Sequence, residues 1–235
     1  MQRYFIDQIV TSNTIELDET IMHHLNHVLR LRTPCEIVIV DASSNVFEVV
    51  VEPKNKYAKV LKQCEHVDDA PIKITLAMAL LKKDKFEWVI QKACELGVSK
   101  IVPFLSERTI VDVSEAEFEK KRVRYQMIAK EACEQSHRQS LCTIESLHQF
   151  TSLDQLEASF KGLCYERVEG ESITLKHCVH QSTLIVVGPE GGFSEKEVQW
   201  AKTHEFHLIT LGHKILRAET AAIAACAMIE AYHDQ

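Results

Sequence analysis

A glycine-rich loop that directly follows an apolar run is the feature that most constrains how this sequence can fold. Three of its seven glycines fall within residues 188–192, just after the run 183–187. Glycine opens backbone conformations that are closed to other residues and lets a ligand approach the main chain closely. Ser194 with Glu197 then has the pattern of a capping box. We therefore expect a buried strand, a ligand-binding loop and a helix in succession; a plain tight turn at the strand end is the alternative.

A second stretch near the C-terminus has the same layout. Residues 206–211 have the pattern of a strand, 212–219 of a loop and 220–232 of an alanine-rich helix. If the two strands are parallel neighbours, both loops leave the same edge of one sheet, where open α/β sheets bind ligands. Backbone groups and aliphatic side chains would then form a pocket suited to a flat heterocycle. The expected lining is Val187, Leu211, Ile215 and Leu216, with Arg217, Glu219 and Thr220 at the mouth.

Strand and helix patterns alternate from about residue 72 onward, which predicts a mostly parallel sheet covered by helices on both faces. Apolar residues at helical spacing predict a helix after Asp84. Asp84 and Glu87 are expected to cap this helix, and Gly97 is expected to end it. Ser114 with Glu117 is expected to begin a long helix that reaches about residue 136. The other expected elements are strands at 72–80, 100–105 and 162–166 and a helix at 152–160.

The first 70 residues have a different, β-rich pattern. Asp18 can cap a helix whose apolar residues share one side at a 3.6-residue period. These residues are Ile21, Met22, Leu25, Val28 and Leu29. Strands are expected at 35–41, 46–52 and 58–65, with a hairpin turn at 43–45, and the polar segment 66–71 has the pattern of a linker. The chain is thus expected to divide into a small barrel, residues 1–70, and an α/β domain, residues 71–235.

Composition disfavours several classes of protein. The eight cysteines are scattered without a Cys-x-x-Cys pair, so we expect reduced thiols, with Cys94, Cys133 and Cys226 on apolar helix faces. His23 and His27 lie one helical turn apart, but nothing nearby completes a ligand set, and no metal is expected. No apolar run approaches the roughly 20 residues of a membrane helix, and the first residues lack a signal-peptide pattern, which favours a cytoplasmic location.

The formal net charge of −7 argues against binding nucleic acid by overall electrostatics. An enzyme that acts on RNA would need local basic patches, for which Arg30 with Arg32 and residues 82–85 are candidates; residues 120–124 are more typical of a solvated helix face. The glycine spacing at 188–192 is not that of a dinucleotide fold, and the patterns of a nucleoside triphosphate loop and a nucleophile elbow are absent. An ATPase, an NAD enzyme and a serine hydrolase are therefore disfavoured.

Residues 188–194 and 211–221 together resemble the cofactor-binding signature of the SPOUT methyltransferases, specifically of the ribosomal RNA small subunit methyltransferase E family. Other segments agree with that family in order along the chain, and the likeness spans essentially the whole sequence. These segments are 24–32, 82–88, 95–98, 106–108 and 131–136.

The resemblance implies an N-terminal PUA-like β-barrel that helps to bind RNA and a C-terminal α/β domain threaded into a trefoil knot. It also implies a homodimer that binds S-adenosylmethionine beside its interface and acts on small-subunit ribosomal RNA in the 30S subunit. The expected cofactor-binding residues are Tyr165, Glu166, Val187, Gly188, Pro189, Glu190, Gly191, Gly192, Leu211, Gly212, Ile215, Leu216, Arg217, Thr220 and Ala221.

The family methylates ring nitrogen three of one uridine in the decoding region of 16S ribosomal RNA. That nitrogen carries a proton at neutral pH, so catalysis must favour the uridine anion and align its nitrogen with the sulfonium methyl group. Arg217 is the expected stabiliser of the anion. Glu219 is expected either to accept the proton or to orient Arg217; the alternative is a carboxylate that only satisfies amides at a helix N-terminus.

Four arginines are expected to contact RNA phosphates, namely Arg30, Arg32, Arg108 and Arg138. The sequence departs from the family pattern at Lys83, where glycine is common, at Lys214, where arginine is frequent, and at 141–142, near which a proline is usual. These departures concern loop conformation rather than chemistry. Two alternatives remain: a related SPOUT enzyme with another target, such as a ribose 2′-hydroxyl or tRNA, and a catalytically silent ribosome assembly factor.

Overall fold

Two separate β-sheets organise the computed structural model of this chain, which describes residues 1–65, 72–166, 174–178 and 180–233. The chain divides into a first unit, Met1–Asp69 with Cys133–Ser140, and a second unit, Ala70–Ala132 with Leu141–Gln235. The sequence predicted a division into residues 1–70 and 71–235; in the structure residues 133–140 group with the first unit. The predicted linker, 66–71, lies outside the described residues.

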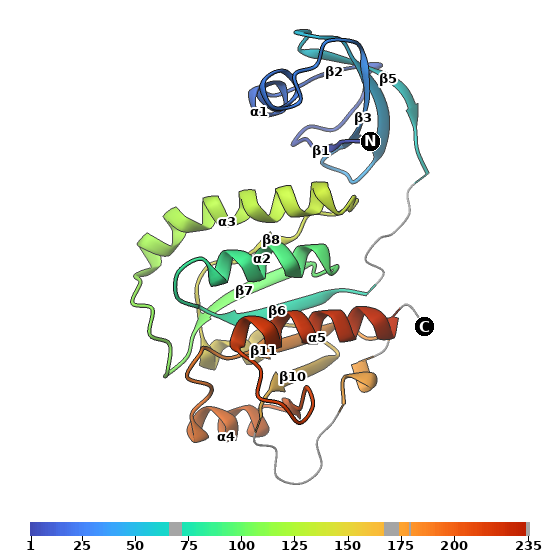
Figure 1. Ribbon diagram of the computed structural model, residues 1–235. Coiled ribbons are helices and arrows are strands. Elements are labelled where there is room, and N and C mark those ends of the chain that lie inside the picture. The colour runs from blue at the N-terminus through green and yellow to red at the C-terminus, as the bar shows by residue number, and fades with distance from the viewer. Residues whose placement is uncertain (66–71, 167–173, 179, 234–235) are drawn as a thin grey trace. The chain divides into compact units, whose positions relative to one another are not determined.

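The first unit is built on a curled five-stranded sheet in the order β1-β3-β4-β5-β2 (Figure 1). Its strands are β1 (Arg3–Phe5), β2 (Thr14–Glu16), β3 (Cys35–Val40), β4 (Val46–Val51) and β5 (Tyr57–Gln63). The β1–β3 pair is parallel, and the other pairs are antiparallel. Alternating apolar side chains of the strands fill its core, among them Ile37, Ile39, Val49, Val51 and Ala58. The three predicted strands and their hairpin are confirmed.

Asp41 fixes the turn between β3 and β4. Its carboxylate accepts hydrogen bonds from the backbone N–H groups of Ser43 at 2.8 Å, Asn45 at 2.9 Å and Val10 at 3.1 Å. Ser44 takes a φ of 61°, which the tight turn requires. Burial acts to raise the pKa of Asp41, but these hydrogen bonds and one from the Asn45 side chain outweigh it, and the pKa lies below its ordinary value.

The predicted helix after Asp18 begins as expected but changes its winding. Asp18 accepts a hydrogen bond from the Ile21 N–H at 2.8 Å and caps α1 (Glu19–His23), which continues as a π-helical turn, η1 (His24–Val28). A π turn holds more residues than an α turn, so the 3.6-residue phase is lost. The prediction that all the apolar residues share one buried side is therefore wrong: Val28 is 59% and Leu29 40% exposed.

Residues 133–140 complete the first unit along β1. The Glu134 carboxylate accepts a hydrogen bond from the Phe5 N–H at 3.0 Å, and the Arg138 carbonyl accepts one from the Arg3 guanidinium at 2.9 Å. Polar groups on an outer strand need such partners or water. This later segment therefore supplies hydrogen-bond partners to the first strand of the chain.

The second unit contains an all-parallel sheet in the order β12-β10-β11-β6-β7-β8, with β9 also paired to β7. Its strands are β6 (Ile74–Ala79), β7 (Lys100–Leu105), β8 (Thr143–Ile144), β9 (His148–Gln149), β10 (Phe160–Cys164), β11 (Thr183–Val187) and β12 (His207–Ile209). The predicted parallel sheet is confirmed. The two strands that precede the candidate loops, β11 and β12, are parallel but not neighbours, because β10 lies between them.

Helices cover both faces of this sheet. On one face α2 (Lys85–Glu95) and α5 (Ala218–His233) lie side by side, and on the other α4 (Glu195–Thr203) packs with the 3₁₀ helix η2 (Phe150–Gln155) on apolar strand side chains (Figure 1). The long helix α3 (Glu115–Gln135) and a short 3₁₀ helix, η3 (Leu175–Cys178), complete the elements. Among the described residues, no helix combines the length and apolar character that a membrane crossing requires.

Of three helix predictions in the second unit, one is confirmed and two are wrong. The apolar stripe of α2 is buried, and Gly97, with a φ of 79°, follows its end as expected. Asp84, in contrast, makes no side-chain capping bond, so its predicted role is wrong. The helix expected at 152–160 is also wrong: Phe150 and Leu153 are buried three residues apart, a spacing that fits the 3₁₀ turn found there, and β10 begins at Phe160.

Candidate functional site

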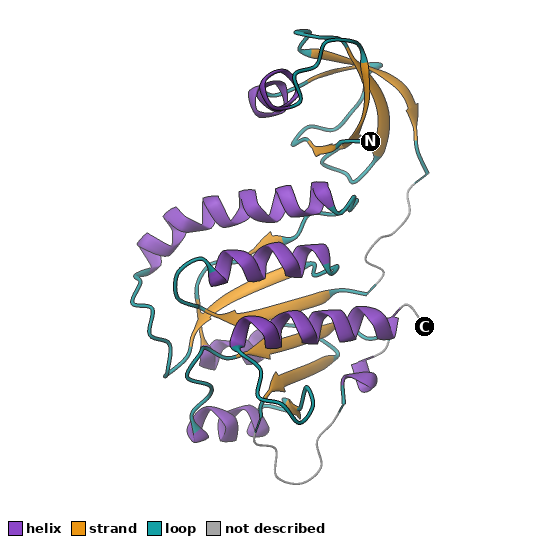
Figure 2. Ribbon diagram, viewed as in Figure 1, coloured by secondary structure: helices purple, strands orange, loops and turns teal. Residues whose placement is uncertain are grey.

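The carboxyl ends of β6, β10, β11 and β12 lie around one cavity, and Figure 2 shows loops (teal) at the ends of the strands of this sheet. The cavity measures about 400 Å³ and is lined mainly by backbone and aliphatic groups. Its lining is Lys85, Cys164, Glu166, Val187, Gly188, Pro189, Glu190, Gly191, Gly192, Phe193, Ile215, Leu216, Arg217, Ala218 and Ala221.

A smaller hollow of about 60 Å³ shares part of this lining, including Glu166, Leu216 and Ala221. It adds residues after β10 and β12, namely Tyr165, Ile209, Thr210, Leu211, Gly212 and Lys214. The structure thus brings together every predicted cofactor-binding residue except Thr220, which lines neither hollow. Since β10 separates β11 from β12, the residues that follow β10 lie between the two glycine-containing loops.

The glycine loop is packed so closely that a side chain at two of its positions would press on its neighbours. A Cβ on Gly188 would lie 3.0 Å from the ring of Phe193, and one on Gly191 would lie 3.2 Å from the Arg108 Cβ. Gly192 takes a φ of 67°, and its N–H donates to the Pro189 carbonyl at 2.9 Å. These constraints keep the main chain of the loop exposed to the cavity rather than covered by side chains.

A buried carboxylate ties this loop to the loop after β7. Glu197 is 7% exposed and completes the predicted capping box, because it accepts from the Ser194 N–H at 2.8 Å while the Ser194 hydroxyl accepts from the Glu197 N–H. Its second oxygen accepts from the Glu107 N–H at 2.9 Å. Next to it, the Arg108 guanidinium donates to the Gly191 carbonyl at 3.2 Å. The 106–109 loop therefore supports the glycine loop from outside the cavity.

Lys85, which the sequence suggested only as part of a basic patch for RNA, lines the cavity. Its ammonium lies 3.0 Å from one oxygen of Glu219 and 3.9 Å from Glu190. Burial acts to raise the pKa of Glu219, but its own backbone N–H, the Lys85 ammonium and the charge of Arg217 outweigh burial and lower that pKa. Glu219 is thus an ionised and weakly basic carboxylate. A lysine at the first position of a helix, where cations are disfavoured, is the sequence signal that would have drawn attention to Lys85.

Arg217 stands at the cavity without a competing partner. It is exposed, and among the described residues its side chain makes no hydrogen bond or ion pair. Its carbonyl accepts the Ala221 N–H at 2.8 Å, which fixes the backbone at the start of α5. The predicted orientation of Arg217 by Glu219 is not seen as a direct contact, since Glu219 binds Lys85 instead. The guanidinium is therefore free to bind an anion.

Cysteine chemistry is disfavoured at this cavity. Burial raises the pKa of the Cys164 thiol to about 12, so the thiol is protonated at neutral pH and is a poor nucleophile. All eight cysteines are free thiols, and Cys94, Cys133 and Cys226 are buried as predicted.

The predicted RNA-contacting arginines differ in exposure. Arg30, Arg32 and Arg108 are exposed, and Arg30 has a φ of 53°. Arg138 is only 5% exposed, and its guanidinium donates to the Ser140 hydroxyl, so its burial argues against a contact with RNA phosphates.

The predicted histidine pair lies in the first unit. The rings of His23 and His27 lie 4.9 Å apart, and His24 is hydrogen-bonded to the Tyr4 hydroxyl at 2.7 Å. Among the described residues, no three side chains of the metal-binding types gather into one group.

Comparisons with known proteins agree on one family. The model of an RNA methyltransferase domain matches residues 68–230. The chain is 35% identical to the ribosomal RNA small subunit methyltransferase E of Bacillus subtilis, over 97% of this chain and 96% of that protein, and 33% identical to that of Mesomycoplasma hyopneumoniae, over 95% and 96%. A crystal structure of this enzyme from Neisseria gonorrhoeae bound to S-adenosyl methionine superposes with a TM-score of 0.86 at 30% identity, over 98% of this chain and 97% of that one.

Proposed function

The chain belongs to the ribosomal RNA small subunit methyltransferase E family, and from this premise we propose that it methylates N3 of a uridine in the decoding region of 16S ribosomal RNA. S-adenosylmethionine is the proposed methyl donor. The observation that carries the proposal is a cavity enclosed by the glycine loop and the start of α5, with the unpaired Arg217 guanidinium on its wall. The uridine as target rests on the family resemblance.

The residues of the cavity fit S-adenosylmethionine. A volume of about 400 Å³ lies within the range of pockets that take ligands of this size. The main chain of residues 188–192 lines the cavity and is proposed to hydrogen-bond a flat base, and Glu166, a carboxylate on the lining, is the proposed acceptor for a ribose hydroxyl. When bound, S-adenosylmethionine supplies an electrophilic methyl group on a sulfonium. The protein's part is to hold it and to exclude water.

Two charged residues have different proposed roles. Arg217 stabilises negative charge on the uridine as N3 loses its proton, because its guanidinium is a fixed donor that no carboxylate of the described residues engages. Glu219 is a poor proton acceptor, since its pKa is lowered and Lys85 holds it. Of its predicted roles, we retain that of a carboxylate that accepts from a backbone amide at the N-terminus of α5.

The remaining features of the proposal come from the family. The curled sheet of the first unit is proposed to be a PUA-like barrel that binds RNA through Arg30 and Arg32, with Arg108 as a further phosphate contact. The second unit is proposed to be a SPOUT domain closed by a trefoil knot. We also propose a homodimer that works in the cytoplasm on the 30S subunit. The small residues Ala222 and Ala225 of α5 are fully buried in the single chain, which supports close packing of that helix within the second unit.

The test of the function is a map of modified uridines, by mass spectrometry, in small-subunit ribosomal RNA from cells that lack the gene. We expect one methyluridine in the decoding region to disappear and to return when the wild-type gene is restored. An unchanged map would refute the proposed target. Loss of a methyl group from a ribose or from tRNA would favour the related-enzyme alternative.

Methyl transfer by an Arg217→Ala variant, with cofactor binding measured beside it, distinguishes an enzyme from a silent assembly factor. Methyl transfer should fall by about 100-fold or more, as for removal of a donor that stabilises a developing anion. Cofactor affinity, measured by calorimetry, should stay within several-fold, because the cavity is formed mostly by other groups. Full methyl transfer in this variant would refute the role of Arg217, and a wild-type protein that does not bind S-adenosylmethionine would favour the silent factor.

A further inference from the structure

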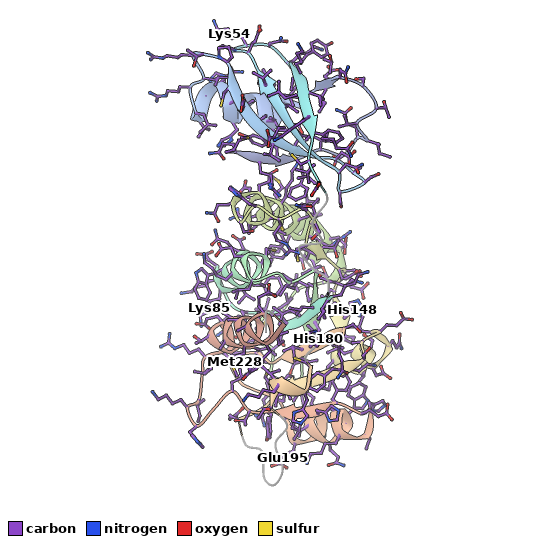
Figure 3. All side chains as sticks on the ribbon, turned by 90° about the vertical axis from the view of Figure 1, so that its right-hand side faces the viewer. Lys54, Lys85, His148, His180, Glu195 and Met228 are labelled. Atoms are coloured by element: carbon purple, nitrogen blue, oxygen red, sulfur yellow. The ribbon has the colours of Figure 1, made fainter. Side chains whose placement is uncertain are left out.

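Lys85 occupies a position that helix stability alone does not favour. It is the first residue of α2, where the partial positive charge of the helix N-terminus repels a cation. Its side chain is only 36% exposed, so the ammonium is also partly desolvated. The carboxylates of Glu219 and Glu190 offset both costs. Figure 3 labels Lys85 in the region where α2 and α5 lie side by side.

These contacts join three of the four segments around the cavity. Lys85 follows β6, Glu190 lies in the loop after β11, and Glu219 lies in the first turn of α5 after β12. Both oxygens of Glu219 lie close to the ammonium, at 3.0 and 3.2 Å. Glu190 also accepts the backbone N–H of Lys82 at 3.3 Å. A single cation thus links elements that are more than 100 residues apart in the sequence.

The charges of Lys85 and Arg217 both act on the Glu219 carboxylate, but only Lys85 contacts it. Arg217 precedes Glu219 by two residues, and its charge acts on Glu219 without a hydrogen bond between them. Glu219 has a side-chain exposure of only 13%, so an ionised carboxylate there needs a cation. In the structure that cation is Lys85. If a neutral residue replaced Lys85, Arg217 would be the remaining cation whose charge acts on Glu219.

We propose that Lys85 is a positioning residue that engages Glu219 and thereby keeps the Arg217 guanidinium available for an anionic substrate. This inference rests on the proposed function of Arg217, which it deepens. It assigns Lys85 no contact with the reacting atoms. Lys85 acts indirectly, because its ion pair with Glu219 prevents Glu219 from pairing with Arg217.

The test is a double-mutant cycle in methyl transfer. Lys85→Met should lower kcat by about 10-fold or more, because Glu219 then captures Arg217 and withdraws a donor from the developing anion. In a Glu219→Gln background the same Lys85 substitution should change kcat by less than about twofold, since no carboxylate is left to capture Arg217. Lys85→Arg should retain most of the activity. Equal losses from Lys85→Met in both backgrounds would overturn the inference.

A matched control uses another ion pair of the second unit. Lys100 lies 3.2 Å from Glu145 at the amino end of β7, far along that strand from the cavity loops. Lys100→Met makes the same chemical change and should leave kcat unchanged. A loss in this control equal to that of Lys85→Met would show that the effect is not specific to the site and would overturn the inference.

A second measurement does not depend on activity. A crystal structure of the Lys85→Met variant should show the Arg217 guanidinium within 4 Å of the Glu219 carboxylate, and the wild-type protein should not. An Arg217 still unpaired in the variant would contradict the inference even if kcat fell. If the proposed function is wrong, the wild-type protein will methylate no uridine. The crystal structure of the variant would still test whether Glu219 pairs with Arg217.

Discussion

Replacing Gly188 by alanine is expected to destabilise the second unit and to weaken cofactor binding at the same time. The new methyl group would lie 3.0, 3.1 and 3.2 Å from three carbons of the Phe193 ring, closer than ordinary van der Waals contact. That ring is 4% exposed, lies parallel to Phe104 with centroids 6.5 Å apart, and lies 5.6 Å from Phe150. The ring has no open space to enter, so the glycine loop must move instead.

The expected cost is that of overpacking a dense core, about 1–3 kcal/mol in the free energy of unfolding. For a domain of this size, that corresponds to a melting temperature lower by roughly 2–12 °C. Because the loop that moves also forms the cavity wall, the affinity for S-adenosylmethionine should fall as well. Thermal unfolding and isothermal calorimetry measure the two effects separately.

Phe193→Leu provides the internal control. The smaller side chain removes the ring that the new methyl group meets, at the cost of a cavity in the same cluster. The Gly188→Ala and Phe193→Leu double variant should therefore lose less stability than the sum of the two single variants, by about 1 kcal/mol. Strict additivity of the two losses would refute the steric reasoning.

Three further predictions concern other parts of the chain. Lys83 has a φ of 55°, so Lys83→Gly should raise the free energy of unfolding by about 0.5–1 kcal/mol; a lower value would contradict this account of backbone strain. Asp41 has a lowered pKa, so its charge stabilises the fold above about pH 4, and this contribution is lost as the pH falls through the folded pKa. The stability difference between wild type and Asp41→Asn should therefore shrink on acidification, and a constant difference would exclude the effect. Arg30→Ala with Arg32→Ala should make the salt dependence of RNA binding shallower by about one unit per lost phosphate contact; an unchanged slope would remove both residues from the interface.

The sequence predicted elements whose apolar period is unbroken. The buried stripe of α2 and the alternating strands β3 and β4 each have one period, and the apolar run of β11 is buried along its whole length; the structure places all of them as expected. Short-range hydrogen-bond patterns were also predictable from the sequence, as at Ser194 with Glu197 and at the turn after β3.

Features that depend on tertiary contacts were not predictable in this way. The π turn after α1 changes the phase within one helix, and a fixed 3.6-residue period cannot show this. The position of β10 between β11 and β12 is a matter of strand order, which local pattern does not encode. Lys85 becomes a site residue only when α2 and α5 lie together, since Glu219 is 134 residues away in the sequence.

The burial of Arg138 was not predictable for the same reason. In the sequence it is a basic residue in a polar stretch, which is typical of a surface that meets RNA. In the structure its segment folds with the first unit, and the side chain is enclosed. Charge type alone does not distinguish a solvated arginine from an enclosed one.

The assembly of the first unit from two distant stretches limits how this protein can be divided. A fragment that stopped at residue 69 would lack Glu134 and Arg138, and with them the acceptors for the Phe5 amide and the Arg3 guanidinium. Exchange of N-terminal domains between relatives by a single crossover near residue 70 would separate β1 from those acceptors. A viable chimera would have to inherit residues 133–140 from the same parent as its first strands.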